Sequence, residues 1–209
     1  MKATFPGFEF VYGDSEFTPD NHTPGGLVST ALQSSGRDWI YLVNADADRE
    51  DFCSDPFRRD HIWSKLPLRS DGSLDRSSPY VVPYSAIQSA VGSFFDGLTD
   101  KEKYKNRIGF VADHCTQDMQ RIHNLFHNDW FGVMPKSVPK HPFLDLASLE
   151  MLAGVEDDHL PSGARLPEKY TDQAHHALYD ARWDREVHEF LMLHSRAVRV
   201  ASGVERLED

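Results

Sequence analysis

Two acidic residues near the N-terminus, Asp14 and Glu16, have a spacing that could hold a metal ion. The preceding residues 8–12 alternate apolar positions and are rich in aromatic side chains, which predicts a strand. Side chains two positions apart on a strand point to the same face, so both carboxylates would project together. Their mutual repulsion would raise the pKa of each, and a hard divalent cation such as Mg²⁺ or Mn²⁺ would relieve it. The alternative is that this D-x-E sequence is a solvated strand end.

A histidine and an aspartate late in the chain, His175 and Asp180, could contribute to the same chemistry. Imidazole titrates near neutral pH and can accept a proton from water. Apolar spacing predicts a helix over residues 172–194, on which positions five apart lie about 140° apart around the axis. The two side chains can therefore reach one site only if His175 lies before the helix or at its first turn. The alternative is a histidine on a helix surface beside a solvated aspartate.

The remaining apolar pattern predicts the elements that would position these groups. Strands are expected at residues 27–32 and 39–43, and with the first strand they form an antiparallel meander joined by short turns. Helices are then expected at 84–95, 118–127 and 146–152, and strands at 107–112 and 143–146. The predicted fold class is α/β, a mixed sheet with an N-terminal antiparallel three-strand meander and flanking helices.

The bulk composition limits the classes of protein that fit. The chain has 209 residues, of which 40% are hydrophobic, so we expect one domain over residues 1–209. A net charge of −11 argues against a broad basic surface for nucleic acid, although phosphates could still bind through metal ions. No apolar run of about 18 residues predicts a membrane span, and the N-terminus does not resemble a signal peptide. Cys53 and Cys115 form no C-x-x-C pair, and free thiols fit a cytoplasmic location.

Residues 46–83 break the pattern with four prolines and a glycine. Single apolar residues such as Phe57, Ile62 and Trp63 allow short helical turns there. We expect an irregular insertion, which is either a functional loop or a plain surface feature.

Together, D-x-E on the first strand and H-x-A-L-x-D-A-R at residues 175–182 resemble the DnaQ-like, or DEDDh, 3′–5′ exonuclease superfamily. That family carries a middle aspartate, often in V-A-H-N-x-x-F-D, and V-A-D-H-C-T-Q-D at residues 111–118 matches its frame. The match assigns the middle aspartate to Asp118, with Asp113 as the rival. Within the superfamily the chain is most similar to the RNase AS-type exoribonucleases, through its D-x-E-F start and D-N-H-T at residues 20–23.

The resemblance implies an RNase H-like fold and a two-metal-ion site with Mg²⁺ or Mn²⁺. Asp14, Glu16 and Asp180 would hold the ion on the side of the attacking water. Asp14 and Asp118 would hold the second ion, on the leaving-group side. His175 would take the proton from the attacking water.

Two neighbours of the D-x-E pair could contact the substrate. Ser15 would offer its backbone or its hydroxyl near the scissile phosphate. Phe17 could stack on a terminal base, or it could be a core aromatic.

The resemblance implies an exoribonuclease that hydrolyses single-stranded RNA from the 3′ end. On the same site, a DNA exonuclease or a phosphohydrolase acting on nucleotides or dinucleotides is an alternative. A nucleic-acid-binding module whose catalysis has decayed is an alternative of another class. Relatives of this size are often homodimers, so a second copy is an expected partner.

Overall fold

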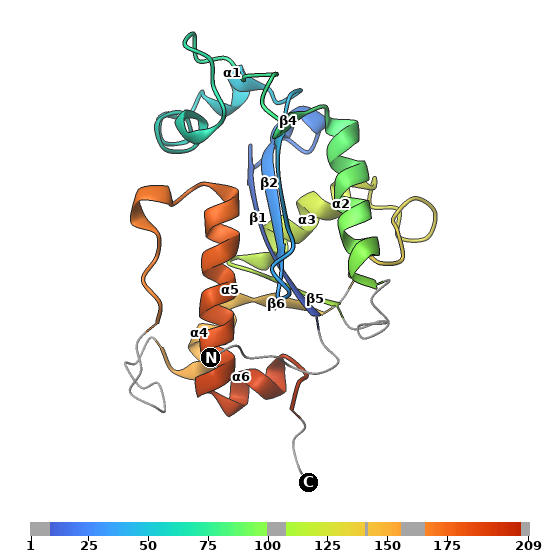
Figure 1. Ribbon diagram of the computed structural model, residues 1–209, viewed down its shortest axis with the longest axis vertical. Helices are drawn as coiled ribbons and strands as arrows, with labels where there is room; N and C mark the ends of the chain where they lie inside the picture. The colour runs from blue at the N-terminus through green and yellow to red at the C-terminus, as the bar shows by residue number, and fades with distance from the viewer. Residues whose placement is uncertain (1–8, 100–107, 141, 156–165, 206–209) are drawn as a thin grey trace.

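The computed structural model describes residues 9–99, 108–140, 142–155 and 166–205. A mixed six-stranded sheet forms the centre of this part, with strand order β4-β3-β2-β1-β5-β6 (Figure 1). The predicted α/β class, with a mixed sheet and flanking helices, is confirmed. The strands are β1 (Glu9–Phe17), β2 (Leu27–Ser34), β3 (Trp39–Asn44), β4 (Val81–Val82), β5 (Ile108–Ala112) and β6 (Phe143–Asp145). The helices are α1 (Arg49–Phe52), α2 (Tyr84–Thr99), α3 (Cys115–Leu125), α4 (Leu146–Ala153), α5 (Ala177–His194) and α6 (Arg196–Ala201).

β1 extends beyond its parallel neighbour, and this extension carries the D-x-E pair. β1, β2 and β3 form the predicted antiparallel meander. β5 runs parallel to β1 but pairs with it only as far as Tyr12, opposite Val111. β2 pairs with the rest of β1, including Asp14 opposite Ala31. β1 is longer than the predicted strand at 8–12 because β2 supplies hydrogen-bond partners to its polar half.

Helices cover both faces of the sheet (Figure 1). α2 and α3 pack on the face that receives Val11. α4 and α5 pack on the opposite face, against Phe10 and Tyr12. Asp14 and Glu16 continue the alternation of Tyr12, so they lie on the α5 side of the sheet. No helix in the described residues is both long enough and apolar enough to cross a membrane.

Two helices begin at residues that the periodicity does not predict. α3 begins at Cys115 rather than at residue 118, because the Asp145 carboxylate accepts a hydrogen bond from the Cys115 backbone N–H at 3.2 Å. α5 begins at Ala177 rather than at residue 172. A separate 3₁₀ turn occupies Thr171–Gln173, and His175 follows it with a φ of 64°. Backbone with a positive φ cannot continue a right-handed helix.

The segment at 46–83 consists of short elements, and its buried side chains share a hydrophobic cluster with the rest of the protein. It contains α1, a π-helical turn at Arg58–Ile62, a 3₁₀ turn at Trp63–Lys65 and the edge strand β4. Five of its side chains are buried with the start of α5 in one hydrophobic cluster; they are Phe52, Ile62, Trp63, Leu66 and Val81. The segment is therefore packed on the body of the protein and is more than a plain surface feature.

Gly13 leaves room for the Phe110 ring of the neighbouring strand β5 immediately before Asp14. A Cβ atom at Gly13 would lie 2.4 Å from Cζ of Phe110, and the Phe110 ring is fully buried. A ring in a close-packed core cannot move away cheaply. The absence of a side chain at this position therefore sets the path of the strand that carries the acidic pair.

We expect Gly13→Ala to lower the free energy of unfolding by about 1–3 kcal/mol, because the added methyl overpacks the core against Phe110. Urea unfolding followed by circular dichroism measures this. Gly97→Ala is the matched control, because a Cβ at Gly97 in α2 meets nothing within 4 Å. That control should be neutral or stabilise by up to about 1 kcal/mol. Equal stability of Gly13→Ala and the wild-type protein would contradict the packing constraint.

Candidate active site

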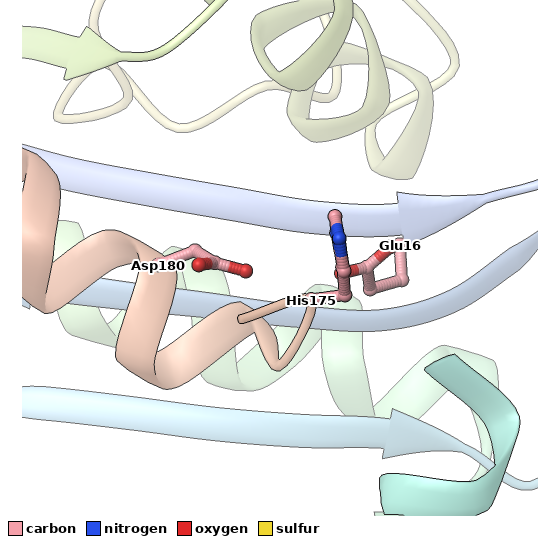
Figure 2. Close-up of side chains that lie close together, drawn as sticks. All are labelled: Glu16, His175 and Asp180. Carbon is pink, nitrogen blue, oxygen red and sulfur yellow. The ribbon is translucent and has the colours of Figure 1, made fainter. Parts of the chain in front are cut away.

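Three of the residues singled out in the sequence meet at the end of β1. One ligand atom from each of Glu16, His175 and Asp180 lies within 4.8 Å of the other two. Figure 2 shows Glu16 on its strand, Asp180 on the first turn of α5 and His175 on the segment just before that helix. Two carboxylates and an imidazole at this separation could bind one divalent cation or hold one water molecule.

The position of α5 explains how His175 and Asp180 meet despite a separation of five residues. The helix begins at Ala177, so His175 precedes it. The left-handed backbone at His175 turns the chain before the first helical residue. The condition drawn from the sequence, that His175 must lie before the helix, is met. The helix predicted from residue 172 would have separated the two side chains.

Asp14 and Asp118 lie deeper, next to this three-residue group. Burial, and after it the charge of Asp180, raise the pKa of Asp14 to about 8. Burial also raises the pKa of Asp118 well above its usual value, followed by the charge of Asp14. Burial raises the pKa of Glu16 well above its usual value, and the charge of Asp14 is the next largest cause. In the part of the chain that the structure describes, Asp14 and Asp118 do not complete a three-atom group as compact as that of Glu16, His175 and Asp180.

The buried oxygen atoms of this cluster fit a metal site. Among the described residues, no hydrogen-bond donor reaches Oδ2 of Asp14 or Oδ1 of Asp118. A buried carboxylate oxygen without a partner is costly, and a hard divalent cation satisfies it while neutralising the mutual repulsion. The donor set of carboxylate oxygens with one imidazole nearby suits Mg²⁺ or Mn²⁺.

A fifth carboxylate, Asp184, belongs to the cluster and was not among the residues picked out from the sequence. It lies one helical turn after Asp180 and is 2% exposed. Its Oδ2 accepts a hydrogen bond from the backbone N–H of Asp113 at 3.1 Å. Burial raises its pKa, and the charge of Asp14 raises it further. The four-residue spacing from Asp180 on a predicted helix was the signal that could have found it.

The rival middle aspartate, Asp113, is also close to the cluster. Its charge raises the pKa of Asp14 as a smaller contribution than burial or Asp180. Its side chain is half-buried, whereas that of Asp118 is 5% exposed. The structure therefore places both aspartates at the site, with Asp118 in the deeper position.

Two lysines bring positive charge to the rim. Lys169 Nζ lies 3.9 Å from Oδ1 of Asp180, and its charge opposes the effect of burial on the pKa of that carboxyl. Lys65 likewise lowers the pKa of Glu16, against the larger effects of burial and of neighbouring carboxylates. Both side chains retain some exposure, so their charges offset the buried acids only in part.

His175 is suited to accept a proton. Burial lowers its pKa below the usual value, while the charge of Asp180 acts in the opposite direction. An imidazole with a lowered pKa is neutral near pH 7, and a neutral ring has a free acceptor nitrogen.

Ser15 and Phe17, the residues expected to contact the substrate, have partners within the protein. The Ser15 hydroxyl lies 3.0 Å from that of Thr30 in the buried part of the sheet, and the Ser15 backbone hydrogen-bonds to Asp118. The Arg121 guanidinium lies over the Phe17 ring at 4.2 Å from its centroid. Phe17 is half-buried under this cation, which favours a structural role over stacking on a base.

Comparison with known proteins identifies the fold. No protein-family model matches the chain, and no curated protein matches its sequence. Solved structures of exonuclease I do match. The complex of E. coli exonuclease I with a dA16 oligonucleotide has a TM-score of 0.60 at 13% identity, covering 92% of this chain and 42% of that one.

Two further structures agree with this match. The zinc-bound complex of E. coli exonuclease I with single-stranded DNA has a TM-score of 0.59 at 12% identity, covering 93% of this chain and 42% of that one. Exonuclease I from Methylocaldum szegediense has a TM-score of 0.55 at 11% identity, covering 94% of this chain and 43% of that one. The chain thus spans less than half the length of these proteins. At such identities the likeness shows the fold alone, and the resemblance to DnaQ-like and RNase AS-type enzymes stays a prediction.

Proposed function

We propose that this chain is a metal-dependent 3′–5′ exonuclease that hydrolyses single-stranded RNA from its 3′ end, and that residues 1–209 form one exonuclease domain with an insertion at 46–83. One observation carries the proposal. Glu16, His175 and Asp180 gather within 4.8 Å of one another, beside Asp14 and Asp118. Each of these two aspartates has one buried carboxylate oxygen without a partner among the described residues. The exonuclease I fold of the solved neighbours supports it.

The motif resemblance implies two sets of metal ligands, which share Asp14. Asp14, Glu16 and Asp180 would hold one ion beside His175, and Asp14 with Asp118 would hold a second. Two divalent cations, when bound, supply charge neutralisation at the phosphorus and support for the attacking and leaving oxygens. The carboxylates would hold the cations in a buried site, where electrostatic interactions are stronger than in water.

His175 acts as the general base in this proposal. Its neutral ring accepts a proton from the attacking water, and the water oxygen forms the new bond to phosphorus. The bond from phosphorus to the 3′ oxygen of the preceding nucleotide breaks, and that oxygen takes up a proton from solvent. The products are a nucleoside 5′-monophosphate and a strand one residue shorter.

The choice of RNA rests on the motif resemblance to the RNase AS-type enzymes. Three of the solved exonuclease I structures are complexes with single-stranded DNA, which favours DNA as the second candidate substrate. The net charge of −11 favours a strand end held mainly at the active site over a long strand held along a basic surface. Dinucleotides therefore belong in the same assay.

We expect purified protein with Mn²⁺ or Mg²⁺ to shorten 5′-labelled single-stranded RNA in single-nucleotide steps. DNA of the same sequence and dinucleotides are assayed in parallel on sequencing gels. His175→Ala should lower kcat by about 10²–10⁴-fold, because the base is lost. The same variant should keep the increase in Tm that metal produces. His194→Ala, at the far end of α5, is the control and should keep full activity.

Absence of product from all three substrates would support the decayed binding module and contradict the proposal. Full activity of His175→Ala would reject the role of that residue while leaving the nuclease assignment in place.

We expect the metal-free protein to lose stability as pH rises. The pKa of Asp14 is about 8 in the folded chain against an ordinary 3.8. A carboxyl with a raised folded pKa stabilises the fold fully below its unfolded pKa, and this contribution is lost as pH rises through the folded value. Between about pH 4 and 8, Tm should therefore fall by about 5 °C or more. Differential scanning calorimetry in chelated buffer measures it.

Asp14→Asn should flatten this pH dependence, because an amide does not titrate. It should also weaken the increase in Tm that Mg²⁺ or Mn²⁺ produces at about pH 8. The exposed Asp172→Asn is the matched control and should behave as wild type. A pH slope that is the same in Asp14→Asn and the wild-type protein would contradict the electrostatic description of the site.

A further inference from the structure

His175 has a backbone conformation that its own residue type does not favour. Its φ of 64° lies in the left-handed region. A histidine adopts this region only at an energetic cost, so neighbouring structure must hold it there. The residue on each side is extended, with ψ of 145° at Ala174 and φ of −121° at His176. The Asp180 carboxylate accepts a hydrogen bond from the His175 backbone N–H, and this bond holds the backbone rather than the imidazole.

Two side chains from the segment at 46–83 contact this conformation directly. Lys65 Nζ donates a hydrogen bond to the carbonyl of Ala174, the residue immediately before His175. The Phe57 ring meets the His175 ring edge to face, with centroids 5.0 Å apart and planes at 80°. One contact holds the backbone, and the other holds the ring.

Phe57 has no other role that its surroundings explain. It is 49% exposed, although a large apolar side chain is normally buried. The rings that pack on it are His175 and His61, the latter at 4.8 Å between centroids. The Phe57 ring thus packs against the imidazole of His175 at the candidate active site and contributes little to the core.

The segment that carries these contacts is firmly attached. Trp63 is 4% exposed, and its Nε1 donates to the Gly72 carbonyl at 3.1 Å. Ile62 and Leu66 are buried in the same cluster as Ala177 and Leu178, the first residues of α5. Lys65 lies between the buried residues Trp63 and Leu66, so the backbone that carries it is held in place. Its ammonium group reaches the Ala174 carbonyl from this fixed position.

We propose that Phe57 and Lys65 are positioning residues for His175, so that the segment at 46–83 fixes the general base of the site. The inference rests on the proposed function of His175. Lys65 holds the left-handed turn through the Ala174 carbonyl, and Phe57 restricts rotation of the imidazole. A catalytic group accelerates a reaction fully only when it is held within a fraction of an ångström of its productive position.

The experiment compares Phe57→Leu, Lys65→Met and Lys65→Arg in steady-state assays on single-stranded RNA with Mg²⁺. Phe57→Leu and Lys65→Met should each lower kcat by about 10-fold or more, with KM within about twofold of wild type. Lys65→Arg keeps a donor and a positive charge, so it should restore most of kcat. Phe131→Leu, which changes a 98% exposed ring on another loop, and Lys136→Met, which changes an exposed lysine, are the matched controls.

A second measurement follows the imidazole without relying on turnover. In NMR spectra of histidine-labelled protein, the His175 ring signal is identified by its loss in His175→Gln. Phe57→Leu should move that signal, because the ring current of Phe57 is removed, and Lys65→Met should broaden it. Tm of Phe57→Leu and Lys65→Arg, which keep the charge at position 65, and the increase in their Tm with Mg²⁺ should match the wild type.

The outcomes separate the two levels of the proposal. Wild-type protein that degrades no substrate contradicts the proposed function, and the NMR spectra still test the positioning. Wild-type kcat in Phe57→Leu and Lys65→Met overturns the positioning role, as does a rise in KM alone, which would indicate direct contact with substrate. An unchanged His175 signal in Phe57→Leu also overturns it.

Discussion

The repulsion among buried carboxylates at the end of β1 is the constraint on which the rest of the structure depends. Burial raises the pKa of Asp14, Asp118 and Asp184, and the charge of a neighbouring carboxylate raises each pKa further above its ordinary value. Such a cluster opposes folding unless protons or cations accompany it. The lysines at the rim offset it only in part, because Lys169 remains 41% exposed at its side chain. The cluster thus has the electrostatic character of a site that works with bound metal.

The sheet and its helices explain why the acids meet. Gly13 allows β1 to continue close against Phe110, and β2 carries it beyond the end of β5. α3 starts immediately after β5 and presents Asp118 to this end of the sheet. α5 starts at the same end, so Asp180 and then Asp184 face β1 from the other layer. The cluster lies where three chain segments leave the sheet, as ligand sites in α/β proteins commonly do.

Substantial parts of this arrangement follow from local sequence. The alternation in β1, the meander after it, and the amphipathic pattern of α2 and α3 are visible because each element buries one face. The D-x-E pair and the order of the later motifs were enough to nominate Asp14, Glu16, Asp118, His175 and Asp180. Asp184 was missed, because an acidic residue on the face of a predicted helix is normally solvated, and nothing local shows that β1 covers it.

The sequence by itself determined which elements form and which residue types are available for chemistry, because hydrophobic periodicity and the functional groups of the side chains are local properties. Tertiary structure decided the rest. It decided that α5 starts at Ala177, since the left-handed turn at His175 is held from a distant segment. It also decided that residues 46–83 are part of the site's surroundings, because the burial of Trp63 against α5 is a long-range contact. Desolvation and contact across the chain exist only after folding, and no pattern of neighbouring residues encodes them alone.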